Sequence, residues 1–356
     1  MSGVWGRNIN LSIFGESHGN AIGVVINGME PGIKINMEEI EKDMERRAPG
    51  RNNLSTSRKE SDKVEILSGI FEGVTTGTPI SMMIKNFDVK SKDYSQFKDI
   101  MRPGHGDFPG NMKYKGFNDY RGGGHFSGRI TAPLVFAGAI AKQILNSKGI
   151  KVGAHIKQIG NIEDGYFDLV NISKEQLDEL LEKEIPVINS DKIAPMKEEI
   201  LKVREEGDSI GGIIECAVLG LEAGLGNPFF DSLESTIAHL AFSVPAVKGI
   251  EFGVGFDFAH MKGSEANDEY YIENNEIKTY TNNNGGITGG ISNGMPVIFR
   301  VAIKPTPSIS KEQRTININS MENTKLVVTG RHDPCIVQRA VVVMEAIAAI
   351  AILEQL

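Results

Sequence analysis

The sequence predicts an α+β fold in one large domain that spans residues 1–356. Strand-like runs follow one another without the regular crossover helices that a doubly wound parallel sheet requires, which favours this class. The chain shows no internal repeat and no linker-like stretch, so neither a solenoid nor two joined domains is expected. A chain of 356 residues is long enough to bury a large core.

The first elements have clear start and stop signals. Asn36 can cap a helix over residues 37–47, whose acidic residues come early and whose arginines come late, as the helix dipole favours. A Pro-Gly pair ends this helix. The strands expected in this part of the chain are residues 20–28, 64–73 and 79–86, the last two separated by the turn-rich sequence TTGT.

The middle of the chain combines a glycine-rich segment with an apolar one. Residues 101–129 have little periodicity and much glycine, which predicts a long functional loop. Residues 131–148 are rich in alanine and have proline only in the first turn, which predicts a buried helix.

The second half alternates between helices and strands. Surface helices are expected at residues 174–184 and 191–206, and a further helix at 232–242. Asp333 and Pro334 are expected to open a terminal helix that reaches Leu356. The other segments are a strand within residues 207–226 that ends in a glycine-rich turn, a strand and bend at 248–263, an irregular loop at 282–294 and a strand at 295–309.

Composition is that of an ordinary globular protein, with 40% hydrophobic and 24% charged residues. No secretory signal is visible, and the longest apolar stretch, residues 340–353, is interrupted by Glu345 and too short to span a bilayer. Cys216 and Cys335 form no disulfide framework and no metal-ligand spacing. These features predict a cytoplasmic protein with no bound metal and no membrane partner.

The net charge of −8 is unevenly distributed. Residues 160–210 hold fourteen acidic and six basic residues, so this segment accounts for the whole excess. Residues 46–63 carry a local charge of +4, and residues 102–129 have five basic and two acidic residues. Two basic regions on an acidic protein favour a focused site for a small anion over a track for nucleic acid, although the first region could equally be a solvated face.

The sequence RGGGHFSGR, at residues 121–129, raises the question of what four glycines and a histidine do between two arginines. Glycine lets a ligand approach the main chain, and guanidinium groups favour an anionic ligand. Histidine also occurs in the segments FGESHG, RPGHGD and GRHDPC, although a single histidine is more often structural than catalytic. None of these segments completes a Walker loop, a dinucleotide fingerprint or an esterase elbow.

Taken together, the segments are much more specific. FGESHG, RRAPG, SGIFEGVTTGTPI, RPGHGD, DYRGGGHFSGR, GDSIGG, AVKGIEFG, GGITGGISNG, KPTPSI and GRHDPC occur in this order over nearly the whole chain, and the sequence resembles the chorismate synthase family. The resemblance implies helices packed between antiparallel sheets and a homotetramer. It also implies loss of phosphate from 5-enolpyruvylshikimate 3-phosphate to give chorismate, a 1,4-elimination that uses reduced FMN and causes no net redox change.

The resemblance also implies roles for individual residues. His18 would act at the departing phosphate, His105 would lie at the flavin, and Asp333 with Ser17 would assist transfer of the C6 proton. Asp333 could equally be only a helix cap. The substrate-binding candidates are Arg46, Arg47, Arg129 and Arg331, with Arg121 behind them, and Arg47 is also the candidate for NADPH. The FMN-binding candidates are His125, Phe126, Ser127, Ala246, Gly289, Lys304, Pro305, Thr306, Pro307, Ser308 and Arg331.

Two departures from the family pattern affect the flavin site. Many relatives have Arg-Ser where this chain has His125 and Phe126, and Pro245 stands where relatives often have asparagine. We expect His125 to contact the flavin more weakly than an arginine would. The sequence has no separate nicotinamide motif, so whether NADPH is a reductant stays open. The alternatives are a flavin- or phosphometabolite-binding protein without turnover and a nucleic-acid module that rests on residues 46–63.

Overall fold

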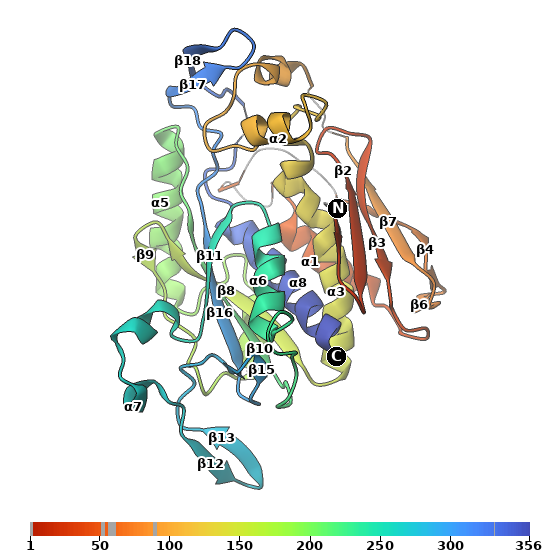
Figure 1. The fold of residues 1–356 in the computed structure, drawn as a ribbon, viewed down its shortest axis with the longest axis vertical. Helices are drawn as coiled ribbons and strands as arrows, with labels where there is room; N and C mark the ends of the chain where they lie inside the picture. The colour runs from red at the N-terminus through yellow and green to blue at the C-terminus, as the bar shows by residue number, and fades with distance from the viewer. Residues whose placement is uncertain (1–2, 51–53, 56–61, 88–90, 331) are drawn as a thin grey trace.

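The computed structural model describes residues 3–50, 54–55, 62–87, 91–330 and 332–356. Two five-stranded antiparallel sheets lie on either side of a layer of helices (Figure 1). The predicted α+β class, with helices sandwiched between antiparallel sheets, is therefore confirmed.

The first sheet has the strand order β1-β2-β3-β7-β4. Its strands are Val4–Trp5, Asn10–Gly15, Ala21–Asn27, Ile80–Lys85 and Val64–Ser68 in that order. The strands predicted at residues 20–28 and 79–86 are confirmed as β3 and β7. The strand predicted at residues 64–73 is interrupted, because Gly69 has a φ of +84° and the chain turns there. A short hairpin follows, formed by β5 (Ile70–Phe71) and β6 (Val74–Thr75).

The second sheet has the order β11-β16-β10-β8-β9. Its strands are Val247–Phe252, Val297–Ile303, Gly212–Leu219, Lys151–Ile159 and Ile162–Glu163 in that order. The sequence analysis assigns no element to β8, which is buried along nearly all its length. A strand buried on both faces lacks the alternation of polar and apolar residues that reveals a strand in a sequence.

Four helices form the middle layer: α1 (Met37–Arg47), α3 (Thr131–Ser147), α6 (Leu233–Ser243) and α8 (Val337–Gln355). As predicted, Asn36 caps α1, accepting hydrogen bonds from the backbone N–H groups of Glu38 and Glu39 at 3.0 and 3.4 Å. Helices α3 and α8 pack against each other and are apolar on almost every side. Their close approach depends on Gly138, because a Cβ there would lie 2.3 Å from the Cβ of Ala346.

The predicted start of the terminal helix is wrong, because α8 begins at Val337 and not at Asp333. The segment before it is held by bonds to distant residues instead. The Thr306 hydroxyl donates to the Asp333 carbonyl at 2.8 Å, and the Ile210 N–H donates to the Pro334 carbonyl at 2.8 Å. The Asp333 carboxylate accepts a hydrogen bond from Arg339 and caps no helix.

The acidic segment lies on the second sheet. Helix α4 (Lys174–Glu182) packs leucines against Ala217 and Leu219 of β10, and α5 (Ile193–Glu205) packs at β8 and β9. Both predicted surface helices are confirmed. The 3-10 turn Ser190–Lys192 precedes α5 and accounts for its later start.

Two predicted loops contain short elements. Residues 101–129 include α2 (Asp107–Lys113) and the 3-10 turns η2 (Gly124–Phe126) and η3 (Gly128–Ile130). Residues 282–294 include the hairpin of β14 (Ile287–Thr288) and β15 (Ile291–Ser292). Elements of two to seven residues are too short to show a period in the sequence.

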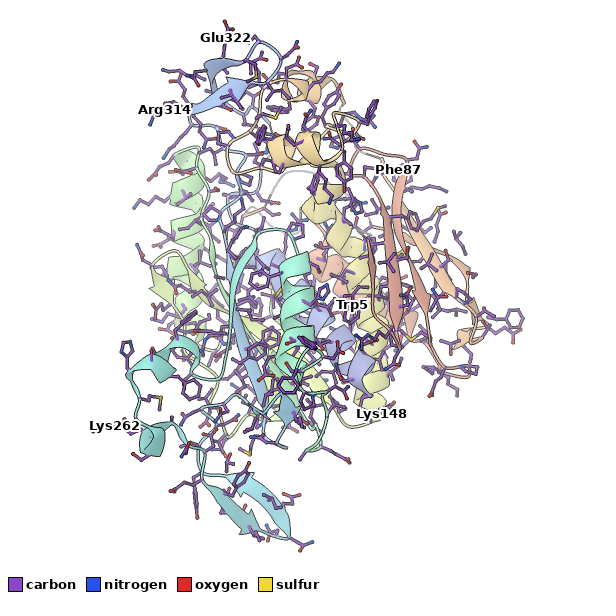
Figure 2. All side chains as sticks on the ribbon, in the orientation of Figure 1. Trp5, Phe87, Lys148, Lys262, Arg314 and Glu322 are labelled. Atoms are coloured by element: carbon purple, nitrogen blue, oxygen red, sulfur yellow. The ribbon has the colours of Figure 1, made fainter. Side chains whose placement is uncertain are left out.

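Most of the remaining elements lie toward the two ends of the molecule (Figure 1). Arg314 and Glu322 mark the hairpin of β17 (Gln313–Asn317) and β18 (Glu322–Leu326) at one end, and Lys262 marks the segment next to α7 (Gly263–Ala266) toward the other (Figure 2). The other elements are η1 (Ser91–Lys98), η5 (Gly255–His260), β12 (Tyr270–Glu273) and β13 (Glu276–Thr279). Among the described residues, no helix is long and apolar enough to cross a membrane.

Candidate active site

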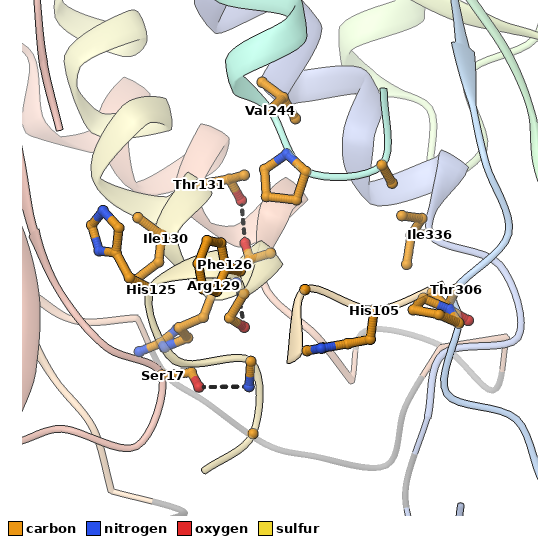
Figure 3. A pocket seen from close by; sticks show the side chains of 18 of the residues that line it. Ser17, His105, His125, Phe126, Arg129, Ile130, Thr131, Val244, Thr306 and Ile336 are labelled. Carbon is orange, nitrogen blue, oxygen red and sulfur yellow. Dashed lines mark hydrogen bonds between the residues drawn. The ribbon is translucent and has the colours of Figure 1, made fainter. Parts of the chain in front are cut away.

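A cavity of about 900 Å³ lies between the two sheets, near α2. Its wall combines segments that are far apart in the sequence: the turn after β2, the end of α1, residues 102–131, residues 242–248, residues 304–308 and the start of α8. In Figure 3, Ser17 and His125 lie on one side of this cavity and Thr306 and Ile336 on the other. The fold therefore brings together the glycine-rich segment RGGGHFSGR and the three other histidine-containing motifs, FGESHG, RPGHGD and GRHDPC.

Most of the predicted site residues line this cavity. They are Ser17, His18, Arg47, His105, His125, Phe126, Ser127, Arg129, Ala246, Lys304, Thr306, Pro307, Ser308 and Asp333. Arg46, Arg121, Gly289 and Pro305 are not among the lining residues, and Arg331 lies outside the described residues. Arg46 instead makes two hydrogen bonds of 2.7 Å to the buried Glu345 carboxylate. Gly289 lies in the β14–β15 hairpin.

The glycine cluster packs directly against Ser17 and His18. A Cβ at Gly122, which has a φ of +61°, would lie 2.4 Å from the His18 ring and 2.7 Å from the Ser17 hydroxyl. The Gly123 N–H donates to that hydroxyl at 3.3 Å, and the hydroxyl lies 3.1 Å from Nδ1 of His18. The question raised by RGGGHFSGR is thus answered in part, because glycine is required where the loop meets the histidine.

Arg47 and Arg129 converge on one carboxylate, that of Asp62. Arg47 donates to one of its oxygens at 2.9 Å, and Arg129 pairs with the other. All three side chains are buried. Burial raises the pKa of Asp62, but the two guanidinium groups lower it more, so this pKa is below its usual value. Asp62 therefore stays ionised and holds both arginines at the cavity wall.

His105 lies beside a second buried carboxylate, that of Asp107. The Nδ1 atom of His105 is 2.7 Å from Asp107 Oδ1. Arg102 binds the same carboxylate through Nε and NH2, both at 2.7 Å, and NH2 also donates to the Gly122 carbonyl at 2.6 Å. Burial and Arg102 lower the pKa of His105, and Asp107 opposes them, so the ring is mainly neutral at neutral pH.

His125 and Phe126, which depart from the family pattern, have clear contacts in the fold. The His125 Nδ1 atom lies 2.8 Å from the Gly15 carbonyl, which can only accept, so Nδ1 carries the proton. The Phe126 ring packs against α2, where a Cβ at Gly106 or Gly110 would lie 3.2 or 2.7 Å from it. Phe126 thus joins the glycine loop to the helix that carries Asp107.

Several lining residues were not predicted. Arg339 donates to the Asp333 carboxylate at 2.5 Å and to the Arg47 carbonyl at 3.0 Å, so it connects two predicted residues. Arg102, Lys113 and Lys248 also line the cavity. Arg102 and Lys248 could have been found from their places in the RPGHGD and AVKGIEFG motifs, whereas nothing in the sequence marks Lys113 or Arg339.

The wall of the cavity is strongly cationic. Its described residues include seven lysine and arginine side chains and a single carboxylate, that of Asp333: the cations are Arg47, Arg102, Lys113, Arg129, Lys248, Lys304 and Arg339. Lys304 has a lowered pKa because it is partly buried and lies near Lys248. Such a wall suits a ligand with several negative charges. Among the described residues, no group of three His, Cys, Asp or Glu side chains could hold a metal ion.

Comparison with known proteins gives a consistent result. A family model for chorismate synthase matches residues 9–356. The chorismate synthase of Pyrococcus abyssi is 47% identical over 352 residues, which cover 99% of this chain and 96% of that protein. The chorismate synthase of Methanobrevibacter smithii is 47% identical over 358 residues, covering 100% of this chain and 96% of that protein. A crystal structure of a chorismate synthase superposes with a TM-score of 0.77 and 29% identity, over 99% of this chain and 92% of that chain.

Proposed function

Because this chain belongs to the chorismate synthase family of shikimate-pathway lyases, we propose that its cavity binds 5-enolpyruvylshikimate 3-phosphate together with reduced FMN. The chain acts as a carbon–oxygen lyase in aromatic amino-acid biosynthesis. In the proposed reaction, hydrogen leaves C6 and phosphate leaves C3 on opposite faces of the ring, and chorismate is formed.

The cationic wall is the observation that carries this proposal. The substrate has a phosphate and carboxylates, and FMN adds a second phosphate, so several cations must converge on one cavity. Among the described residues, seven lysine and arginine side chains line it. Arg47 and Arg129, which Asp62 holds in place, are assigned to the substrate. Arg331 remains a candidate contact for both the substrate and FMN, and this assignment rests only on its place in the sequence.

The departing phosphate needs a proton donor or a cation. His18 is assigned this role, because an imidazole can act as a general acid and give a proton to the leaving oxygen. Ser17 lies 3.1 Å from His18 Nδ1, so it can hold the ring in one orientation. Asp333 is assigned, together with Ser17, to assist transfer of the C6 proton. The Thr306 hydroxyl donates a hydrogen bond to the Asp333 backbone carbonyl.

The residues present fit a bound FMN. At about 900 Å³, the cavity is near the upper end of the roughly 300–1,000 Å³ of ligand pockets. Residues 125–127, Ala246, Lys304 and residues 306–308 line it and would hold the cofactor, with His105 beside them. Reduced FMN would supply electron density to a reaction without net redox change. The side chains of this chain would then bind and orient the substrate and exchange protons with it.

The remaining parts of the proposal concern the whole protein. We propose a homotetramer in the cytoplasm, formed from chains that each act as one domain over residues 1–356. The cavity draws its lining from segments in both halves of the chain, between Gly3 and Val343, which supports a single functional unit. NADPH, with Arg47 as its candidate contact, is proposed as a reductant only if the protein reduces its own flavin.

An anaerobic assay tests the proposal. Purified protein is mixed with 5-enolpyruvylshikimate 3-phosphate and chemically reduced FMN, and chorismate and phosphate are followed over time. A second reaction contains oxidised FMN and NADPH. We expect product in the first reaction, and product in both would show that flavin reduction is built in. Product in neither would favour a binding protein without turnover.

His18→Ala provides the residue-level test. Because His18 is assigned to the phosphate, turnover should fall by about 10²–10⁴-fold while FMN affinity stays nearly unchanged. His260→Ala is the matched control, since His260 is exposed and does not line the cavity. Unchanged turnover in His18→Ala would remove His18 from the mechanism.

A further inference from the structure

The Asp107 carboxylate is placed between two cavity residues, Arg102 and His105. Its Oδ1 atom lies 2.7 Å from Nδ1 of His105, and Arg102 grips both of its oxygens. The Arg102 N–H donates to Oδ2 as well, at 3.1 Å. Asp107 and Arg102 are buried, and His105 shows only 16% of its side chain. Arg102, Asp107 and His105 thus form a row of three charged or titratable groups, and the two outer members line the cavity.

The row determines which ring nitrogen of His105 carries the proton. An ionised carboxylate can only accept a hydrogen bond, so the nitrogen next to it must be the donor. A neutral imidazole has one donor and one acceptor nitrogen, and a partner on one nitrogen therefore fixes the role of the other. We propose that Asp107 is a positioning residue that holds His105 as the Nδ1–H tautomer, leaving Nε2 as the proton acceptor available to the cavity.

The carboxylate is itself well fixed. Burial raises the pKa of Asp107, but the hydrogen bonds from Arg102 and the adjacent His105 ring together lower it more, so Asp107 is ionised at neutral pH. It also lies in the first turn of α2, where the helix dipole favours a negative charge. The Arg102 guanidinium lies 4.4 Å from the centre of the Phe97 ring, which limits its movement.

Only a neutral imidazole can choose between two tautomers, and the surroundings of His105 favour the neutral ring. The groups that affect its charge are Arg102 and Lys304, which lower its pKa together with burial, and Asp107, which raises it. The net result is a lowered pKa and hence a neutral ring. The approach of Nδ1 to Asp107 is oblique, since this buried atom has no well-directed hydrogen bond within the described part of the chain. Proximity and charge, and not an ideal hydrogen bond, therefore set the tautomer.

This inference deepens the proposed function, in which His105 lies beside FMN, and rests on it for its catalytic meaning. A ring nitrogen that accepts a proton can take a hydrogen bond from an N–H group of the cofactor, whereas an Nε2–H tautomer would offer a donor there. The tautomer would thus determine which groups of the cofactor His105 can contact.

The first test uses ligand-free protein and needs no catalysis. Histidine labelled with ¹⁵N in the ring is incorporated, and the ring signals are assigned with His105→Gln. We expect Nδ1–H for His105 in the wild-type protein and a large shift toward Nε2–H in Asp107→Asn, whose side chain can turn its NH₂ group toward Nδ1. Asp119→Asn is the matched control, because it removes a carboxylate bound to Arg121 in the same segment without contacting His105.

The outcomes separate clearly. An Nε2–H ring in the wild-type protein would overturn the proposal, and so would an unchanged tautomer in Asp107→Asn. If Asp107→Asn does not fold, the wild-type tautomer alone decides, with Nδ1–H in support. In the anaerobic assay, Asp107→Asn should lower kcat by roughly 10²-fold with a much smaller change in KM and in FMN affinity. A wild-type protein that makes no chorismate would refute the proposed function but leave the tautomer result standing.

Discussion

At the scale of single residues, Asp62 determines how Arg47 and Arg129, two of the arginines in the cavity wall, are held. It is buried, and its φ of +41° lies in the left-handed region, which Asp and Asn tolerate better than most residues. Both guanidinium groups bind its carboxylate. In the proposed function, the anionic ligand would meet two arginines whose orientation is set by one internal anion.

Asp62→Asn should weaken substrate binding and stability together. The variant keeps the backbone conformation but removes the charge that orients Arg47 and Arg129, so we expect KM for the substrate to rise more than kcat falls. Removing one partner of a buried ion pair costs about 3–5 kcal/mol in the free energy of unfolding at neutral pH. Steady-state kinetics and urea unfolding at pH 7 measure the two effects.

The pH dependence provides the control for Asp62→Asn. A carboxylate whose folded pKa is lowered contributes its full stability above its unfolded pKa of about 3.9, and this contribution is lost as the pH falls through the folded value. The difference in unfolding free energy between wild type and Asp62→Asn should therefore shrink as the pH is lowered below about 4. A constant difference between pH 7 and pH 3 would show that the charge of Asp62 is not the cause.

Where a motif carries them, the sequence predicts residues that the fold brings to the cavity. His18, His105 and Asp333 were found because they lie in short segments that also contain glycine or proline. Asp62 and Arg339 were missed, because their importance lies in partners at positions 47, 129 and 333 that only the fold brings close. Asp107 lies within a quoted motif, yet its contact with His105 is a matter of geometry and not of pattern.

At the scale of elements, α2 and the glycine loop are joined by Phe126. This ring packs on Gly106 and Gly110 and lies 6.2 Å, centre to centre, from the Tyr114 ring. The helix has only seven residues and no side-chain cap at its start. A helix of this length is not stable alone, so its packing against Phe126 helps to keep Asp107 at His105.

Gly110→Ala tests this packing. Inside a helix, alanine normally stabilises by about 0.5–1 kcal/mol relative to glycine. Here the new methyl group would lie 2.7 Å from the Phe126 ring, and overpacking costs about 1–3 kcal/mol. We therefore expect a net loss of stability, measured by urea unfolding, and restoration of much of it by adding Phe126→Leu.

Gly263→Ala is the matched control for this change. Gly263 starts α7, and a Cβ there would meet no atom within 4 Å. It should therefore leave stability unchanged or raise it. Equal effects of Gly110→Ala and Gly263→Ala would mean that Phe126 does not confine α2.

The elements that the sequence revealed are those with end signals. Helix α1 has a capping asparagine, and α6 has Ser232 in the same role. Strand β8 was missed because burial on both faces removes alternation, and the start of α8 was misplaced because Asp333 and Pro334 imitate a cap. In both cases tertiary contacts override a local signal.

At the scale of the whole molecule, the charges are separated. The acidic segment covers the second sheet through α4 and α5, whereas the cavity wall is cationic. Net charge alone, −8, would suggest repulsion of an anionic substrate. The local field of the cavity should instead attract it, since clefts lined by one sign of charge focus the potential.

The rate of substrate capture should therefore depend on salt. Raising the ionic strength from about 0.01 to 0.15 M shortens the Debye length from about 30 to 8 Å, so kcat/KM should fall while kcat changes little. Lys248→Gln, at an exposed position of the cavity wall, should make this dependence shallower. Lys202→Gln, on the exposed face of α5, is the control and should leave the salt dependence of kcat/KM unchanged. Equal salt slopes for all three proteins would exclude a role for the local field at Lys248.

The assembly of the cavity from distant segments links ligand binding to unfolding. Its wall needs the turn after β2, the end of α1, residues 102–131, and the segments that follow α6 and β16 to be in place at once. A ligand that binds only this assembled state stabilises it by RT ln(1 + [L]/Kd), or about 2.7 kcal/mol at a hundredfold excess over Kd. That free energy is shared by both sheets and the helices between them. Occupancy would thus raise the melting temperature of the molecule as one cooperative unit, and no excised fragment would be expected to retain the affinity.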